Sequence, residues 1–246
     1  MLLYVRIVAL TLLVGVLPLL AAEPTAWKDL LADPAATFRQ PMGDWKMVGD
    51  AKIDPSNPRL LIGTEGKGVF LNGKKGRERD LYTKEKFGDV EVQLEFLLSK
   101  GSNSGLKFHG VYEIQICDSY GKPDDQLTGS DNGGIYPRAN LTPVYKPIDK
   151  GIAPKTNACL GPDKWQKLTA IFVAPRFDAQ GNKIANARLV KVTLNGKIIH
   201  ENQELATPTG HNWTKKETST GPLMLQGDHG PVAFRNVRVR PYVPAK

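Results

Sequence analysis

The chain has 246 residues, of which 41% are hydrophobic and 24% charged, and its formal net charge is +8 at pH 7. No helix-turn-helix, zinc-finger or aromatic RNA-binding pattern accompanies this basic balance, so the composition argues against nucleic acid as the partner. The two cysteines, Cys117 and Cys159, have no neighbouring cysteine or histidine with which to build a structural zinc site. In an exported protein they could form a disulfide, and Cys117 could equally be a buried apolar residue.

The first 22 residues have the pattern of a secretory signal peptide. Arg6 precedes a mostly apolar run over residues 7–20, and the small residues Ala21 and Ala22 follow it. Pro18 interrupts the run, which is shorter than the roughly 20 residues that a membrane-spanning helix needs. We therefore expect cleavage after Ala22 and export to the periplasm or the extracellular space, with no membrane span afterwards. The mature chain, 23–246, is expected to fold as a single β-sandwich domain.

The first half of the mature chain has the pattern of β-strands. Trp45 is expected to open the first strand and to pack its ring on the core. Glycine and proline then divide residues 52–86 into short apolar pieces joined by tight turns. From residue 89 to 98, apolar side chains alternate with acidic or amide ones, which is the period of a strand with one buried face. The apolar positions are Val90, Val92, Leu94, Phe96 and Leu98.

The alternation continues through residues 106–117 on both sides of Gly110, which predicts a β-hairpin. A three-residue turn over residues 110–112 would pair His109 with Glu113 and Lys107 with Gln115. These four side chains would then share one face, which could accept protons, donate hydrogen bonds or hold a cation. The same pattern is also typical of the solvated face of an ordinary surface hairpin.

The remaining segments predict further strands and one long loop. Residues 119–164 are rich in Gly, Pro, Asp and Asn, and a connection of this length is usually a functional loop or lid. Strand patterns resume at residues 165–174, and the Asn195-Gly196 pair predicts a hairpin with a type I′ turn. Two more strands are expected around residues 227–230. Sustained helical periodicity is missing from the mature sequence, so we predict an all-β fold, an antiparallel β-sandwich with long loops at one edge.

Seven short motifs occur in order between Trp45 and Pro241: GSNSGLKF, YEIQICD, GGIY, KWQKL, VTLNGK, LMLQGDHG and FRNVRVRP. In this order they make the chain resemble the 3-keto-disaccharide hydrolase domain family. The resemblance implies a concanavalin-like jelly-roll sandwich, export from the cell, and action on sugars that have been oxidised at C3.

The hairpin and the resemblance together indicate site residues. The candidates for catalysis are Glu113, His229 and His109, the last standing where the family often has an arginine. The candidates for substrate binding are mostly polar side chains: Asn103, Gln115, Gln226 and Arg235, which match family positions, and Tyr136.

A ketone at C3 suggests a chemistry for these residues. It makes the C2 proton acidic, so a base could remove that proton, the C1 substituent could leave by elimination, and water could add to the resulting glycal. His109, His229 or Glu113 could be the base. The enolate oxygen could be held by the amide of Gln115, or by a divalent metal ion bound to Glu113 and His109. Direct hydrolysis of the 3-keto-glycoside by Glu113 and Asp118 is the other enzymatic route, although the alternation puts these carboxylates on opposite faces.

A non-catalytic carbohydrate-binding module is the alternative function, because the same kind of sandwich serves lectins and fold alone does not decide function. Its binding platform would use the rings of Trp213 and Tyr136 with the amides of Gln115 and Gln226. In both interpretations the partner is a carbohydrate. Turnover of 3-keto-glycosides, compared with binding of unoxidised sugars, separates the two.

Overall fold

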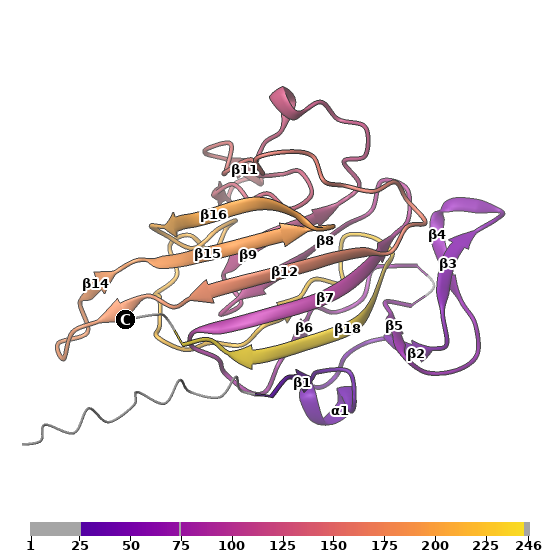
Figure 1. The fold of residues 1–246 in the computed structure, drawn as a ribbon, viewed down its shortest axis with the longest axis horizontal. Coiled ribbons are helices and arrows are strands. Elements are labelled where there is room, and N and C mark those ends of the chain that lie inside the picture. The colour runs from indigo at the N-terminus through magenta and orange to yellow at the C-terminus, as the bar shows by residue number, and fades with distance from the viewer. Residues whose placement is uncertain (1–25, 74, 244–246) are drawn as a thin grey trace, which may run out of the picture.

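The computed structural model describes residues 26–73 and 75–243. The predicted signal peptide therefore lies outside the described residues. In the part that is described, no helix has the length and apolar character to cross a membrane. The described chain forms a larger and a smaller β-sheet, three two-stranded hairpins, long loops and two short helical turns, α1 (Pro34–Thr37) and the 3-10 turn η1 (Asp124–Gln126). Figure 1 shows how these strands and loops are arranged.

The larger sheet contains strands from every part of the mature chain. Its order is β16 (Lys197–Leu205), β15 (Ala187–Leu194), β12 (Gln166–Val173), β7 (Val90–Leu98), β18 (Val232–Pro241), β5 (Val69–Leu71) and β2 (Lys46–Val48), and β1 (Lys28–Asp29) also pairs with β18. All of these pairs are antiparallel.

The smaller sheet is also antiparallel. Its order is β6 (Leu81–Tyr82), β17 (Met224–Leu225), β8 (Asn103–Phe108) and β9 (Tyr112–Cys117). Three short hairpins lie outside the two sheets: β3 (Ala51–Asp54) with β4 (Asn57–Gly63), β10 (Ala139–Asn140) with β11 (Lys146–Pro147), and β13 (Arg176–Phe177) with β14 (Lys183–Ala185).

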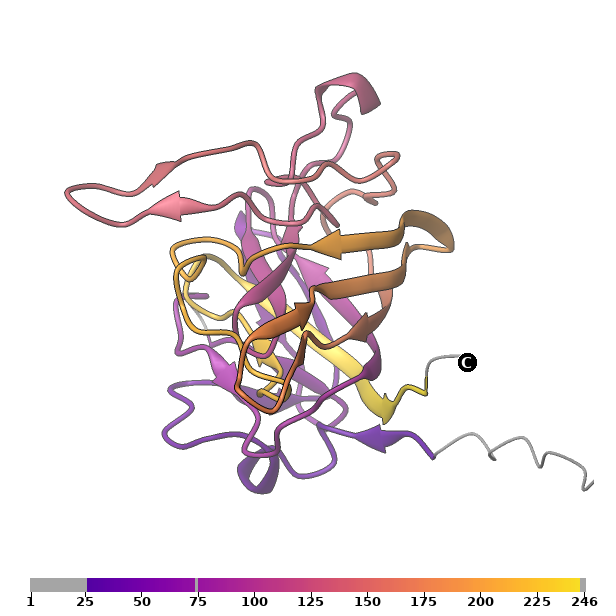
Figure 2. The same cartoon turned by 90° about the vertical axis from the view of Figure 1, so that its left-hand side faces the viewer.

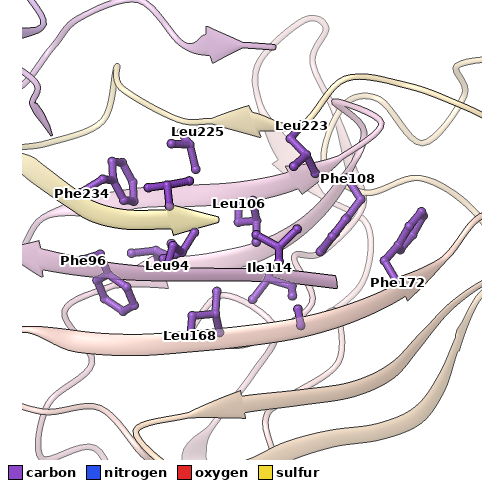
Figure 3. Packing of buried hydrophobic residues seen from close by; sticks show 14 of the residues in the cluster. Leu94, Phe96, Leu106, Phe108, Ile114, Leu168, Phe172, Leu223, Leu225 and Phe234 are labelled. Atoms are coloured by element: carbon purple, nitrogen blue, oxygen red, sulfur yellow. The ribbon is translucent and has the colours of Figure 1, made fainter. Parts of the chain in front are cut away.

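The core lies between the two sheets. Inward residues of β7 and β12 meet inward residues of β8, β9 and β17, and the rings of Phe108 and Phe172 stack with centroids 4.6 Å apart. Figure 3 shows this packing for Leu94, Phe96, Leu106, Phe108, Ile114, Leu168, Phe172, Leu223, Leu225 and Phe234. Each such side chain contributes about 1.5–3 kcal/mol when it leaves water, so the alternating pattern is enough to hold the sheets face to face. The predicted antiparallel jelly-roll sandwich is confirmed.

Several local predictions can be compared with this fold. The Trp45 ring stacks on Phe70 in the core, as predicted, but Trp45 immediately precedes β2 and not the first strand, because β1 comes earlier in the chain. Asn195 and Gly196 form the β15–β16 turn with φ values of 50° and 81°, which confirms the predicted hairpin. The strands around residues 227–230 do exist, but they belong to different sheets. This last turn therefore crosses the sandwich and does not close a hairpin.

The predicted turn of the central hairpin is wrong by one residue. The observed pairs are Lys107 with Glu113 and Phe108 with Tyr112, so the turn consists of residues 109–111. His109 and Gly110 take positive φ values of 54° and 70°. The packing explains the shift, because this register buries Tyr112, which is 1% exposed, beside Phe108 on the core face. Lys107 and Glu113 still share the outer face of the small sheet, whereas His109 is in the turn.

The cysteine alternatives are also decided by the structure. Cys117 and Cys159 are both free thiols. The Cys117 thiol donates to Ser130 O at 3.3 Å, and the Cys159 thiol to Leu160 O at 3.2 Å. The predicted disulfide is therefore not present. Burial raises the pKa of the Cys117 thiol, which keeps it protonated.

The long segment between β9 and β12 covers one edge of the small sheet. Gln115 N–H donates to Gly134 O at 2.8 Å, and Gly133 N–H donates to Gln115 O at 2.7 Å. Tyr136 N–H donates to Glu113 O at 3.2 Å. The loop thus continues the sheet beyond β9, and it encloses side chains on the outer face that a bare hairpin would leave in water.

Candidate active site

A cleft of about 540 Å³ opens on the outer face of the small sheet. Its floor comes from β8 and β9, one wall from the crossing turn after β17, and the opposite wall from the long loop. The lining residues are Asp80, Asn103, Lys107, Glu113, Gln115, Tyr136, Leu141, Tyr145, Gly210, His211, Gln226, Asp228 and His229. Six of the predicted site residues are therefore brought together: Asn103, Glu113, Gln115, Tyr136, Gln226 and His229.

The floor of the cleft holds a buried ion pair. Lys107 Nζ lies 3.2 Å from Glu113 Oε2, and the two side chains are only 10% and 4% exposed. Burial raises the pKa of Glu113 above its usual value, although the Lys107 charge opposes this rise. Burial alone would lower the pKa of Lys107, but the Glu113 carboxylate prevails and raises it. Glu113 is therefore a stronger base than an exposed glutamate.

A glycine on the neighbouring strand makes room for this carboxylate. Gly105 lies opposite Gln115 in the hairpin, and a Cβ at position 105 would be only 2.5 Å from Glu113 Oε1. A side chain there would push Glu113 out of its place beside Lys107. The second glycine of the GSNSGLKF motif, which lies in β8, therefore leaves the space in which the Glu113 carboxylate lies.

The crossing turn brings a histidine to the wall. His229 Nδ1 is hydrogen bonded to the Asp228 carboxylate and lies 3.2 Å from Gln226 Nε2. A carboxylate can only accept, so Nδ1 carries a proton, and Nε2 is the ring nitrogen available to a ligand. Backbone hydrogen bonds hold the turn beside the floor, with Gln226 N–H donating to Gly105 O at 2.9 Å and Gly227 N–H to Asp80 Oδ1 at 3.0 Å.

Two amide oxygens at the cleft have no hydrogen-bond partner in the described structure. They are Oε1 of Gln115 and Oε1 of Gln226. Gln115 is 2% exposed, and its Nε2 makes only a long bond of 3.4 Å to Ser130 O. A buried acceptor left unpaired costs about 1–3 kcal/mol. These oxygens are therefore suited to accept hydrogen bonds from hydroxyl groups of a ligand such as a sugar.

The long loop supplies two tyrosines to the far wall. Tyr145 Oη donates to Tyr136 Oη at 2.8 Å. Burial and this hydrogen bond raise the pKa of Tyr145, so its hydroxyl stays protonated. The pair offers aromatic surface opposite the ion pair, which suits the apolar face of a sugar ring.

The structure does not bring His109 to the cleft. Its ring is 8% exposed and packs edge-on against Phe172, with centroids 5.1 Å apart, on the core side of the hairpin. Burial lowers the pKa of His109 and favours the neutral ring. The prediction that His109 shares a face with Glu113 and Gln115 is therefore wrong. The positive φ at position 109 turns this side chain away from the floor.

Arg235 lies outside the cleft too. It is on β18 of the large sheet, where its guanidinium is 2.7 Å from Glu95 Oε2 and 4.1 Å from the centre of the Trp165 ring. Arg235 does not line the cleft, because the strand after the crossing turn belongs to the opposite sheet. Trp213 does not line the cleft either, and Arg138 lies 5.6 Å from its ring centre.

The side chains around Glu113 do not fit a divalent metal ion. Among residues 26–73 and 75–243, no group of three or more His, Cys, Asp or Glu is arranged to hold one. The predicted second ligand, His109, is on the other side of the hairpin, and Lys107 already neutralises Glu113. A cation at Glu113 would be repelled by the lysine 3.2 Å away.

Comparison with known proteins assigns the family. The model for the family described as "3-keto-alpha-glucoside-1,2-lyase-like domain" matches residues 39–240. The chain belongs to this family. A 3-keto-disaccharide hydrolase of Bacteroides thetaiotaomicron is 25% identical over 203 residues, which cover 77% of this chain and 62% of that protein. The chain thus spans less than two thirds of the length of this relative.

Solved structures support the fold of the lyase-like domain. A Parabacteroides distasonis protein named "putative glycosyl hydrolase" superposes with a TM-score of 0.54 at 24% identity, over 81% of this chain and 82% of that one. A second protein of the same name and organism has a TM-score of 0.51 at 19% identity, over 89% of this chain and 100% of its own. All the cleft residues lie within the part that matches the lyase-like domain.

Sequence reasoning missed several residues of this cleft. Lys107 was placed on the correct face but was not assigned to the site. A turn starting one residue earlier would have put it opposite Glu113. Asp80 and Tyr145 come from segments far away in the chain. No local pattern connects them with the hairpin, so only the folded chain shows them as neighbours.

Proposed function

We propose that this protein cleaves the C1–O bond of 3-keto-glycosides, including 3-keto-disaccharides, by removing the proton at C2, with Glu113 as the base. The observation that carries the proposal is the buried Lys107–Glu113 ion pair on the floor of an open cleft. Membership of a family of 3-keto-glycoside lyases and hydrolases supports the substrate class. From the predicted signal peptide we further propose that the enzyme acts in the periplasm or outside the cell.

In the first step the Glu113 carboxylate takes the C2 proton. The electrons of the C–H bond move toward C3, and the negative charge arrives on the C3 oxygen. Lys107, which faced an anion on Glu113, now faces an anion on the sugar. The number of buried charges stays the same, so the cleft stabilises the enolate without new desolvation, and the low local dielectric makes the lysine effective.

In the second step the ketone forms again. The electrons of the enolate make a C1–C2 double bond, and the C1–O bond breaks. His229, protonated on both ring nitrogens for this step, donates its Nε2 proton to the departing oxygen, while its Nδ1–H stays hydrogen bonded to the Asp228 carboxylate. Water can then add to C1 of the 3-keto-glycal. Its oxygen bonds to C1, one of its protons goes to His229 Nε2, and Glu113 returns its proton to C2, which gives the free 3-keto sugar and restores both residues. Elimination and net hydrolysis thus share one route.

The other polar groups of the cleft fit the role of binding the sugar. The unpaired oxygens of Gln115 and Gln226 can accept from sugar hydroxyls, and Asn103 adds an amide beside them. Tyr136 supplies a ring for the apolar face of the sugar. These contacts alone would also serve a carbohydrate-binding module, so the test must detect chemistry at C2.

The test combines one substitution with one isotope measurement. Glu113→Gln should lower kcat/KM for a 3-keto-glycoside by at least about a hundredfold, the lower range for loss of a general base. Glu95→Gln is the matched control, because Glu95 is also paired with a cation but lies outside the cleft. Urea unfolding of both variants checks that the fold is intact.

The isotope measurement uses the unaltered protein. A substrate with deuterium at C2 should react more slowly than the protonated one, because the C2–H bond breaks during turnover. Near-normal turnover by a folded Glu113→Gln variant would contradict the assignment of the base. A protein that binds 3-keto-glycosides and cleaves none of them would instead be a binding module.

A further inference from the structure

The β10–β11 hairpin carries an exposed apolar patch beside the cleft. Four large hydrophobic side chains of this arm are exposed: Leu141 57%, Val144 69%, Tyr145 44% and Ile148 42%. Figure 2 shows the arm, in pink, reaching away from the sandwich. Residues 139–148 contain a single charged residue, Lys146. A cluster of this kind on the surface usually marks a place where another molecule binds.

This patch is continuous with the cleft. Leu141 and Tyr145 line the cleft, while Val144 does not. Tyr145 is held in place by its hydrogen bond to Tyr136, another cleft residue. The charged and amide groups come from the floor and from the crossing turn, so the two ends of the cleft differ in polarity. A ligand that fits both ends must have a polar part and an apolar part.

We propose that the wall formed by the arm binds the leaving group of the substrate, and that this leaving group is an uncharged aromatic aglycone. The inference rests on the proposed function, which places the 3-keto sugar over Lys107 and Glu113. Leu141 and Tyr145 are then the residues that determine specificity for the aglycone. A phenyl ring gains by leaving water against these side chains.

A second sugar fits this wall less well. Its hydroxyls would lose hydrogen bonds to water, and the aliphatic side chain of Leu141, which lines the cleft, offers none in return. Sites that bind sugars combine aromatic rings with many donors and acceptors, as the floor of this cleft does. The arm has the ring of Tyr145, but its other exposed apolar groups are aliphatic.

The experiment compares two ligands that share the sugar and differ in the aglycone. Binding of phenyl and methyl 3-keto-α-glucoside is measured by calorimetry on the mature chain, with turnover blocked by short exposure or low temperature. The phenyl compound should bind about tenfold more tightly or better, as expected for burying an apolar ring. Leu141→Asn should reduce this preference to within about twofold. Val144→Asn, the matched exposed control outside the cleft, should preserve it.

Two results would overturn the inference. One is equal binding of the two compounds, or a preference for phenyl that Leu141→Asn leaves unchanged. The other is a stable dimer in sedimentation that Val144→Asn dissociates, because the patch would then cover a second copy of the chain. Binding does not require turnover, so the two proposals can fail separately. Absence of cleavage would count against the proposed function, whereas the binding preference for the phenyl compound tests the inference about the aglycone.

Discussion

The outer faces of the two sheets each carry a glutamate paired with a cation, and the two pairs behave in opposite ways. On the large sheet, the hydrogen bonds from Arg235 and Asn236 outweigh partial burial and lower the pKa of Glu95. On the small sheet, burial outweighs the charge of Lys107 and raises the pKa of Glu113. The exposed pair is the shorter one, 2.7 Å against 3.2 Å. Burial, and not contact distance, therefore decides the direction in which each glutamate pKa shifts.

The difference comes from what lies over each face. The side chains of Glu95 and Arg235 remain 23% and 34% exposed, so water screens their charges. Loop residues 133–136 and the crossing turn enclose the small sheet, and Glu113 keeps only 4% exposure. The two strands have the same alternating pattern in sequence. The loop and the crossing turn cover the polar face of the small sheet, and this face therefore holds a buried ion pair in a cleft.

The largest effect should follow from breaking the buried pair. Lys107→Met leaves Glu113 buried without a partner, which should cost about 3–5 kcal/mol of unfolding free energy in urea near neutral pH. A carboxyl whose folded pKa is raised favours folding only while it is protonated. The loss should therefore be small below about pH 4 and grow as the pH rises through the folded pKa of Glu113.

A double variant sharpens this prediction. Lys107→Met with Glu113→Gln removes both charges and should recover most of the stability, while turnover stays lost. Equal unfolding free energies for Lys107→Met and the parent protein across this pH range would show that the pair is not buried in solution.

An effect of intermediate size is expected from His109, which lies on the core side of the hairpin and away from the cleft. Burial lowers the pKa of His109, so the folded state binds its proton less readily than the unfolded state. The free energy of unfolding then has its full value above about pH 6.5. It falls as the solution is acidified, by up to about 1.4 kcal/mol per pH unit. His109→Met should flatten this part of the urea stability profile and leave kcat/KM near the parental value. A large loss of turnover would place His109 in catalysis after all.

The smallest effect should come from the exposed pair. Arg235→Met should change the unfolding free energy by less than about 1 kcal/mol, and high salt should reduce even this difference. Turnover of a 3-keto-glycoside should stay within about twofold of the parent, because no atom of Arg235 lines the cleft. A large rise in KM would restore Arg235 as a substrate-binding residue and break the contrast between the two faces.

Much of the fold could be predicted from the sequence because its cause is local. Alternation along residues 90–98 already determines which side chains of β7 face the core, and the burial of this strand follows it. The Asn195-Gly196 pair specifies its own turn, because few residues other than asparagine and glycine accept positive φ there. The same alternation put Lys107, Glu113 and Gln115 on one face, and the observed strand pairing confirms this shared face.

What the sequence by itself determined is the all-β architecture and the side of each strand on which a residue lies, since both depend on contacts between neighbours in the chain. Only the tertiary structure decided which polar face was buried. Asp80 and Tyr145 reach Glu113 from distant segments, and His109 and Arg235 leave the site because of a turn shift and a change of sheet. Burial depends on what the rest of the chain lays over a face, and burial sets the charge state of Glu113.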